Sequence, residues 1–186
     1  MENIMVAEGK GAIKGHKTNW VSDDPQFPCN GVDQNYLVQY ECYQMQTSRM
    51  LGLSNYNFKY VADKCQDAPK DMIEVCYRSM GRDVAGQTLR DPSKIISFCQ
   101  IAPVNNFRDC IRGALNVIID FWGENLADQP QQLCKRLSEE DKGYCYTLLG
   151  TRLKDIFGKN NGKIEQVCQM GEKDFREACL NGTSQI

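Results

Sequence analysis

Ten cysteines are the residues of this chain whose type and spacing could do chemistry. A cysteine sulfur can bind a metal ion, attack a substrate or form a disulfide. In the last four cysteine pairs the two residues are 11 apart, and in the first pair they are 13 apart. Each pair begins 34 to 36 residues after the one before, which indicates a repeated structural unit. The ten are Cys29, Cys42, Cys65, Cys76, Cys99, Cys110, Cys134, Cys145, Cys168 and Cys179.

Metal binding and catalysis fit this sequence poorly. Structural zinc sites take closely spaced ligand pairs such as C-x-x-C, which the chain lacks, and its only histidine is His16. The sequence also lacks the haem signature C-x-x-C-H and the G-x-S-x-G, H-E-x-x-H and Walker motifs. The glycine-rich segment 9–15 follows no strand pattern, so we interpret it as an irregular leading segment. We therefore predict no catalytic residue, no metal ligand and no cofactor.

Prolines and apolar residues locate helices around each cysteine pair. Pro69 and Pro103 lie between paired cysteines, and proline begins or ends helices rather than continuing them. After a second cysteine, apolar residues recur at one, four and eight positions, as in Tyr77, Met80 and Val84, which is one face of a helix. Each pair therefore brackets the turn of an antiparallel hairpin, where Cα atoms about 5–6 Å apart suit a disulfide. The predicted bonds are Cys29–Cys42, Cys65–Cys76, Cys99–Cys110, Cys134–Cys145 and Cys168–Cys179.

The same pattern gives the expected helices. The first helices of the hairpins are predicted at 55–66, 91–100, 128–137 and 161–170, and the second helices at 33–51, 71–84, 105–121, 139–157 and 172–181. Asp91-Pro92 has the residue types of an N-cap and a first helical position. Ser138 and Asp141 resemble a capping box at the start of the helix that carries Cys145. The sequence predicts an all-α fold with no strand.

The predicted organisation is an irregular N-terminal segment at 1–28 and a hairpin array at 29–186. The cysteine register divides the array into five repeats, at about 29–64, 65–98, 99–133, 134–167 and 168–186. This arrangement resembles the tetratricopeptide and Sel-like α/α-repeat families, and most nearly the secreted cysteine-rich Sel-like proteins of bacteria. The resemblance covers residues 29–181 and rests on the period, the C-x10-C pairs and Tyr77, Tyr146, Gly81 and Gly150. It implies a right-handed α/α solenoid of about five helical hairpins, with one disulfide per hairpin.

The charge and hydropathy of the chain argue against nucleic-acid binding and against a membrane span. The chain has 22 Lys and Arg against 24 Asp and Glu, so no basic field predicts binding to nucleic acid. Its apolar runs are far shorter than the roughly 20 residues that span a bilayer, so we predict no membrane span. Ten cysteines suit an oxidising compartment, which predicts an extracellular or periplasmic location. Because the first residues do not resemble an export signal, we expect the chain to begin after one or to be an interior part of a longer protein.

Repeat arrays of this kind are typically binding scaffolds. We therefore expect a scaffold, not an enzyme, whose partner is a protein or a cell-surface polymer. One alternative is a structural protein that self-associates end to end into a fibre. Another is a small extracellular enzyme or ligand-binding domain without a recognisable motif.

The aromatic residues suggest where a partner binds. The first hairpin departs from the repeat, since Gln46 replaces an apolar residue four positions after its second cysteine. Residues that break a repeat pattern are candidates for function. We therefore predict that Trp20, Tyr36 and Tyr40, with the segment 8–28, form the recognition surface. Tyrosines that directly follow a cysteine are expected in the core, whereas Tyr144 is a second surface candidate because the neighbouring cysteine must point into the hairpin.

Overall fold

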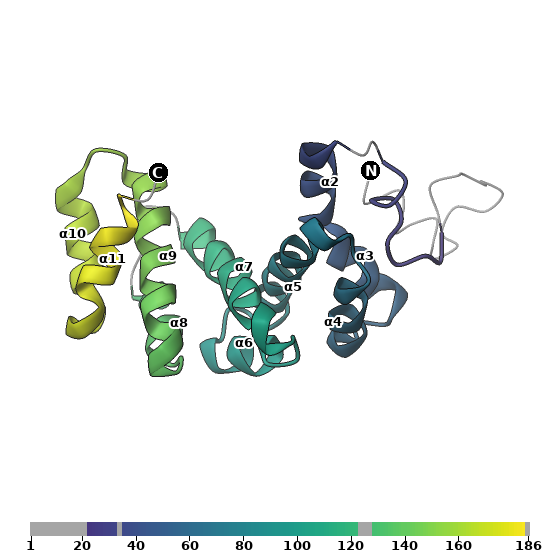
Figure 1. The fold of residues 1–186 in the computed structure, drawn as a ribbon. Helices are drawn as coiled ribbons and strands as arrows, with labels where there is room; N and C mark the ends of the chain where they lie inside the picture. Colours follow the sequence, from purple (N-terminus) through teal and green to yellow (C-terminus); the bar gives the residue numbers. More distant parts are fainter. Residues whose placement is uncertain (1–21, 33–34, 123–127, 185–186) are drawn as a thin grey trace. The chain divides into compact units, whose positions relative to one another are not determined.

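The computed structural model describes residues 22–32, 35–122 and 128–184, and every regular element in these ranges is a helix (Figure 1). The all-α prediction is therefore confirmed for the described part of the chain. The helices are α2 (Tyr36–Tyr43), α3 (Gln46–Leu53), α4 (Phe58–Gln66), η1 (Lys70–Met72), α5 (Ile73–Gln87), α6 (Pro92–Cys99), α7 (Val104–Trp122), α8 (Gln129–Lys135), α9 (Glu139–Phe157), α10 (Asn161–Gln169), η3 (Lys173–Phe175) and α11 (Arg176–Gly182), where η marks a 3-10 helix.

The chain divides into two compact units, Met1–Met80 and Gly81–Ile186, which we call unit 1 and unit 2. The division falls inside α5, not at a boundary between cysteine repeats. Within the described ranges no helix combines the length and apolar character needed to cross a membrane.

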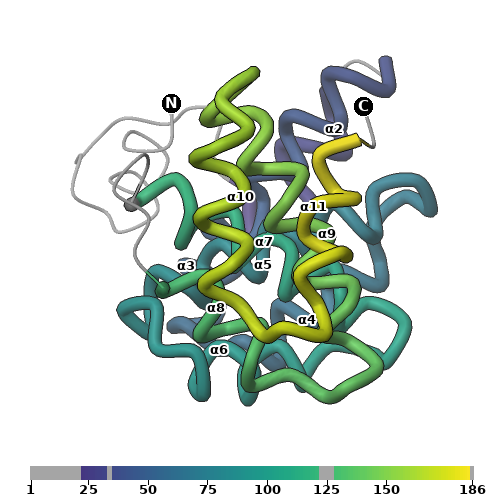
Figure 2. Tube along the Cα trace, turned by 90° about the vertical axis from the view of Figure 1, so that its left-hand side faces the viewer, coloured from purple at the N-terminus to yellow at the C-terminus, as the bar shows by residue number. Residues whose placement is uncertain are grey.

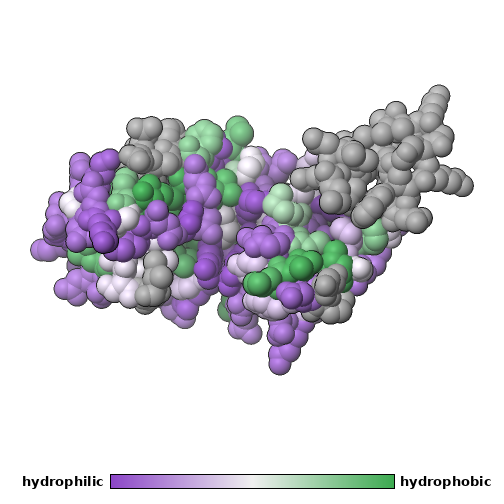
Figure 3. Space-filling view, turned by 90° about the horizontal axis from the view of Figure 1, so that it is seen from above, coloured by the Kyte–Doolittle hydropathy of each residue, from purple (hydrophilic) through white to green (hydrophobic). Residues whose placement is uncertain are grey.

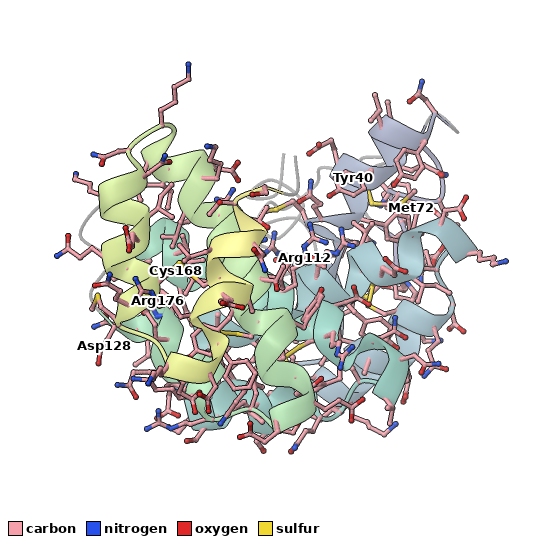
Figure 4. All side chains as sticks on the ribbon, turned by 60° about the vertical axis from the view of Figure 1, so that its left-hand side comes forward. Tyr40, Met72, Arg112, Asp128, Cys168 and Arg176 are labelled. Carbon is pink, nitrogen blue, oxygen red and sulfur yellow. A yellow bond between two sulfur atoms is a disulfide. The ribbon has the colours of Figure 1, made fainter. Side chains whose placement is uncertain are left out.

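Five disulfides join the cysteines in the pairs that the spacing predicts. Their Cα–Cα distances are 5.4 to 5.7 Å, and none of the ten cysteines is free. In four pairs the first cysteine lies at or near the end of a short helix and the second near the start of the next, so the bond closes a helical hairpin (Figure 4). These hairpins are α4 with α5, α6 with α7, α8 with α9, and α10 with α11.

Three of the short first helices begin with an N-cap residue whose side chain bonds the helix backbone. The side chain of Asp91 accepts a hydrogen bond from the backbone N–H of Lys94 (3.0 Å) and Pro92 follows it, as the sequence predicts. Asn57 and Asn160 cap α4 and α10 in the same way, at nearly the same place in their repeats. A side-chain oxygen at this position satisfies helix N–H groups that have no partner inside the helix.

The predicted capping box at the start of α9 is wrong in its bonding. Ser138 is the N-cap residue, but its side chain makes no bond to the helix backbone. Its hydroxyl instead donates to the carboxylate of Asp141 (2.7 Å), and the other oxygen of that carboxylate accepts from Nε of Arg108 in α7 (2.8 Å). The contact between α7 and α9 thus uses the carboxylate that the capping box would have required.

The first cysteine pair departs from the predicted hairpin. Cys29 lies in a turn rather than in a helix, so its disulfide joins a turn to α2. The single helix expected at 33–51 is also wrong, because α2 ends at Tyr43 and α3 begins at Gln46. The fold therefore contains four helical hairpins with a disulfide among the described residues, preceded by a turn and two short helices.

The side chain of Gln46 accounts for the interruption. It is buried, and its Nε2 donates to the backbone carbonyls of Pro25 (2.6 Å) and Phe27 (2.8 Å). These bonds fix the start of α3 against the turn that carries Cys29. The departure of Gln46 from the apolar pattern thus has a structural cause, and it does not itself indicate a binding residue.

One face of each second helix supplies much of the core. The three tyrosines that directly follow a cysteine, Tyr43, Tyr77 and Tyr146, are at most 1% exposed, as expected for core positions. Tyr77 donates its hydroxyl to the carbonyl of Ala62 (2.8 Å), and Tyr43 donates to Gln26 (3.0 Å). Burial is tolerated because each phenol retains a hydrogen-bond acceptor.

In unit 2 the second helices pack in sequence. α9 lies against α7 on one side and against α11 on the other, and α10 and α11 lie side by side (Figure 2). A glycine permits the close approach of α9 and α11, because a Cβ atom at Gly150 would overlap the backbone of Cys179. The fold thus presents α7, α9 and α11 as neighbouring helices whose outer residues form one surface of unit 2.

Candidate binding surfaces

The helix α2 exposes apolar side chains in unit 1. Tyr36, Leu37 and Val38 are 53%, 67% and 44% exposed, and the ring of Tyr36 lies 5.9 Å from that of Tyr40 (centroid to centroid), tilted by 32°. Tyr40, which is labelled in Figure 4, is half-buried. Asn35 fixes the start of the helix by accepting a hydrogen bond from the backbone N–H of Leu37 (2.9 Å). The structure thus brings together two of the residues predicted for recognition.

The space-filling view shows where hydrophobic side chains gather at the surface. Hydrophobic residues gather in more than one patch on the face shown, each bordered by hydrophilic ones (Figure 3). The exposed side chains of Leu37 and Val38 make α2 an apolar element of the surface of unit 1.

The opposite face of α2 packs into unit 1. Gln39 and Tyr43 are buried there, and burial, with a smaller contribution from the carboxylate of Asp24, raises the pKa of Tyr43 to about 12. The helix carries only one charged residue, Glu41. Its inner face therefore buries an amide and an aromatic ring, whereas its outer face is largely apolar.

The third residue predicted for recognition, Trp20, lies outside the described residues, as does the predicted segment before residue 22. The described remainder of that segment contacts the start of the array. Arg49 of α3 donates to the carbonyl of Ser22, and Gln26 donates to the carbonyl of Lys64 at the end of α4 (2.7 Å). This stretch therefore forms part of the packed structure of unit 1.

A second surface lies along α7 and α9 in unit 2. Near the N-terminal ends of these helices Arg108 bonds Asp141, and near their C-terminal ends Arg152 bonds Asp120 (2.5 Å). The guanidinium of Arg108 also lies 5.6 Å from the ring centroid of Tyr144. Tyr144 is half-buried, so the structure places this surface candidate at the contact between the two helices.

A buried lysine links α9 to the last hairpin. Lys142 has only 9% of its side chain exposed and donates to Glu139 (2.6 Å) and Glu172 (2.9 Å). These two hydrogen bonds, that to Glu139 first, raise its pKa. Tyr146 adds a hydrogen bond to Glu172 and stacks on Phe175, with ring centroids 5.6 Å apart. Because every charge here has a partner within the fold, we interpret the cluster as a structural clamp.

Among the described residues, no three His, Cys, Asp or Glu side chains are grouped as metal ligands. Comparison of the chain with protein-family models, with curated proteins and with solved structures gives no match. The function must therefore be argued from the two surfaces.

The sequence interpretation missed Leu37 and Val38, which are both exposed. The sequence did contain a feature that predicts this exposure. The segment Tyr36–Tyr43 reads YLVQYECY, and its polar residues do not gather on one face of the helix. It also missed Arg112, whose half-buried position could not be read from the repeat pattern.

Proposed function

We propose that this protein is a disulfide-stabilised helical repeat scaffold, secreted or periplasmic, which binds another protein through the outer face of α2. The observation that carries this proposal is the exposure of three consecutive apolar residues, Tyr36, Leu37 and Val38, on a helix whose other face already packs into unit 1. Apolar side chains gathered at a surface mark sites of interaction.

The character of α2 supports a protein partner. A surface helix normally turns its apolar side chains toward the core, whereas α2 exposes three of them, so its outer face suits burial against a further element. Tyrosine rings provide a large contact area at a small entropic cost, and aromatic residues are enriched in the cores of interfaces. The paired rings of Tyr36 and Tyr40 therefore match the centre of such a contact.

The size and charge of this face favour a short segment of the partner. An eight-residue helix is about 12 Å long, too small for the roughly 800 Å² per partner of a standard protein interface. Glu41 is exposed on α2, and Asp23 and Asp24 are exposed in the turn of unit 1 that precedes it. A segment with apolar side chains flanked by lysine or arginine would complement these features.

The repeats supply the scaffold in this proposal. We propose that the hairpins stack as a right-handed α/α solenoid, as in the Sel-like repeat proteins that the sequence resembles. Recurrent packing supports this, since Gly81 and Gly150 occupy the same register position and each contacts the next second helix through backbone atoms. Five disulfides are typical of proteins in oxidising compartments, which supports the secreted or periplasmic location.

The hairpin of α10 and α11 has a polar surface. Polar residues occupy most of its exposed positions, namely Lys163, Glu165, Gln166, Gln169, Glu177 and Asn181. A fibre that docks through this hairpin would require an apolar face there.

The test compares capture of a partner by the wild type and by α2 variants. The protein is immobilised and exposed to the extracellular fraction of the source organism, and the bound proteins are quantified by mass spectrometry. We expect Leu37→Ser combined with Tyr36→Ser to reduce recovery of the partner at least tenfold. Helical content should be retained, because both side chains are mostly exposed.

Val104→Ser in unit 2 is the matched control, since Val104 is an exposed apolar residue (91%) on another helix. It should recover the partner like the wild type. A photo-crosslinking amino acid at position 37, but not at position 104, should form a covalent bond with the same partner. Equal recovery by the wild type and the α2 variant would place the binding surface elsewhere.

A further inference from the structure

Two ion pairs hold α7 against α9 and leave a stretch without ion pairs between them. Arg108 with Asp141 closes one end, and Asp120 with Arg152 closes the other (2.8 and 2.5 Å). The partners are 33 and 32 residues apart, so the two helices run side by side in a fixed register. Every charged group in these two pairs is neutralised within the fold.

Between the two ion pairs, α7 carries Arg112 and Asn116 (Figure 4 labels Arg112). They are four residues apart, so their side chains lie on one face of the helix, with Cβ atoms about 5–6 Å apart. Both are half-buried, and within the described residues neither makes a side-chain hydrogen bond or an ion pair. This face therefore offers the guanidinium donors of Arg112 and the amide donor of Asn116 to an external acceptor.

The register of α7 against α9 determines which residues of α9 lie level with Arg112 and Asn116. With an offset of 32 to 33 residues, Arg112 is level with Tyr144 and Asn116 with Leu148 on α9. Both α9 residues are half-buried, so each leaves part of its side chain at the surface. The arrangement combines hydrogen-bond donors on one helix with an aromatic and an aliphatic side chain on the other.

We propose that Arg112 and Asn116 bind a side-chain carboxylate of an acidic, partly apolar segment of a protein, with Tyr144 and Leu148 contacting the apolar residues beside that carboxylate. The planar guanidinium of arginine matches a carboxylate through two parallel hydrogen bonds. The amide of Asn116 adds a donor one helical turn away. This site is separate from the outer face of α2 and does not depend on it.

The charges of the site favour a singly charged group. Arg112 makes no ion pair among the described residues, whereas Arg152 is shared by Asp120 and Asp155, and Arg108 by Glu140 and Asp141. The carboxylates near the ends of the two helices therefore outnumber the arginines that pair with them. A carboxylate balances the charge of Arg112 alone. The excess carboxylates, Glu140 and Asp155, disfavour a doubly charged phosphate more strongly than a singly charged carboxylate, because the repulsion between like charges grows with the charge of the ligand.

The test uses a synthetic blocked peptide with a central Glu between leucines, and the same peptide with Gln in that place. Nuclear magnetic resonance follows the Arg112 Nε–H signal of the full-length, disulfide-bonded protein. We expect a saturable shift with the Glu peptide and at least tenfold weaker binding of the Gln peptide. Binding of the Glu peptide should also weaken as salt is raised. Equal binding of the two peptides would overturn the proposal.

Variants separate recognition from general attraction. Arg112→Lys keeps the charge but loses the paired hydrogen bonds, so we expect about tenfold weaker binding. Arg136→Ala is the matched control, because Arg136 is the exposed C-cap residue after α8, and its side-chain hydrogen bonds go to Gln132. This variant should bind like the wild type. A Glu peptide that binds Arg112→Lys as tightly as the wild type would contradict the proposed geometry. An equal response to inorganic phosphate would contradict the preference for a carboxylate.

Discussion

Gly150 of α9 lies so close to the carbonyl oxygen of Cys179 in α11 that a Cβ atom at residue 150 would overlap that oxygen. Gly81 of α5 has the same relationship with the carbonyl oxygen of Cys110 in α7. Each glycine comes five residues after the second cysteine of its own hairpin. One register position therefore brings two pairs of second helices into backbone contact, and this contact depends on the absence of a side chain.

Gly150→Ala should lower the free energy of unfolding by about 1–3 kcal/mol, because the methyl group meets backbone atoms that can move only if α9 and α11 separate. Urea denaturation followed by circular dichroism measures the change. Gly86→Ala is the control, since Gly86 is exposed in α5 and a Cβ atom there would meet no atom of another element within 4 Å. There, alanine should raise stability by about 0.5–1 kcal/mol. A loss of equal size at both positions would mean that close packing is not the cause.

The disulfides should carry much of the stability of the hairpins. Each closes a loop of 11 or 13 residues, which corresponds to about 2–3 kcal/mol in the chain-entropy model. We expect replacement of Cys134 and Cys145 by alanine to cost about 2–5 kcal/mol. Reduction of all five bonds should remove much of the far-ultraviolet helical signal near 37 °C. A spectrum that reductant leaves unchanged at that temperature would show that packing alone holds the helices.

The repeated hairpins were predictable because local rules and the cysteine period agree. Asp91 caps the helix that its residue type predicts, and Tyr77 is buried where the helical spacing places it. In these positions helix capping, hydrophobic periodicity and disulfide geometry all specify the same structure. The sequence was therefore sufficient for most helix boundaries and for the cysteine pairing.

The first cysteine pair was not predictable in the same way, because long-range hydrogen bonds decide its structure. Gln46 bonds two carbonyls about 20 residues earlier in the chain, and no local propensity encodes that contact. Asp141 likewise bonds Arg108, which is 33 residues away. The candidate surfaces were the hardest part to predict, because the exposure of Leu37 and of Arg112 depends on tertiary packing.

Tyr43 should make stability depend on pH in the alkaline range. Burial raises its folded-state pKa to about 12, whereas in the unfolded chain it ionises near 10. Its stabilising contribution is therefore complete below about pH 10 and is lost as the pH rises toward 12. In Tyr43→Phe we expect a shallower fall in the free energy of unfolding between pH 9 and 11, measured by urea denaturation. Parallel pH profiles for the wild type and the variant would contradict this assignment.

Left-handed backbone recurs where a second helix ends and the next hairpin begins. Asn55 and Leu89 have φ angles of 53° and 51°, and Gly158 has 56°. The three positions are 34 and 69 residues apart, so they occupy one place in the repeat. Glycine adopts this conformation without steric cost, whereas a residue with a Cβ atom does so at about 1–2 kcal/mol.

Leu89→Gly should therefore stabilise the protein. The side chain of Leu89 is 79% exposed, so its removal sacrifices little packing while it relieves the strained backbone of the loop after α5. Part of this gain is offset because glycine is more flexible in the unfolded chain, which leaves an expected net increase of about 0.5–1 kcal/mol in the free energy of unfolding. Val104→Gly provides the contrast, since Val104 is also exposed (91%) but begins the helix α7, where glycine should be neutral or destabilising. Urea denaturation of both variants measures the two changes, and a destabilised Leu89→Gly would show that the loop depends on its leucine side chain.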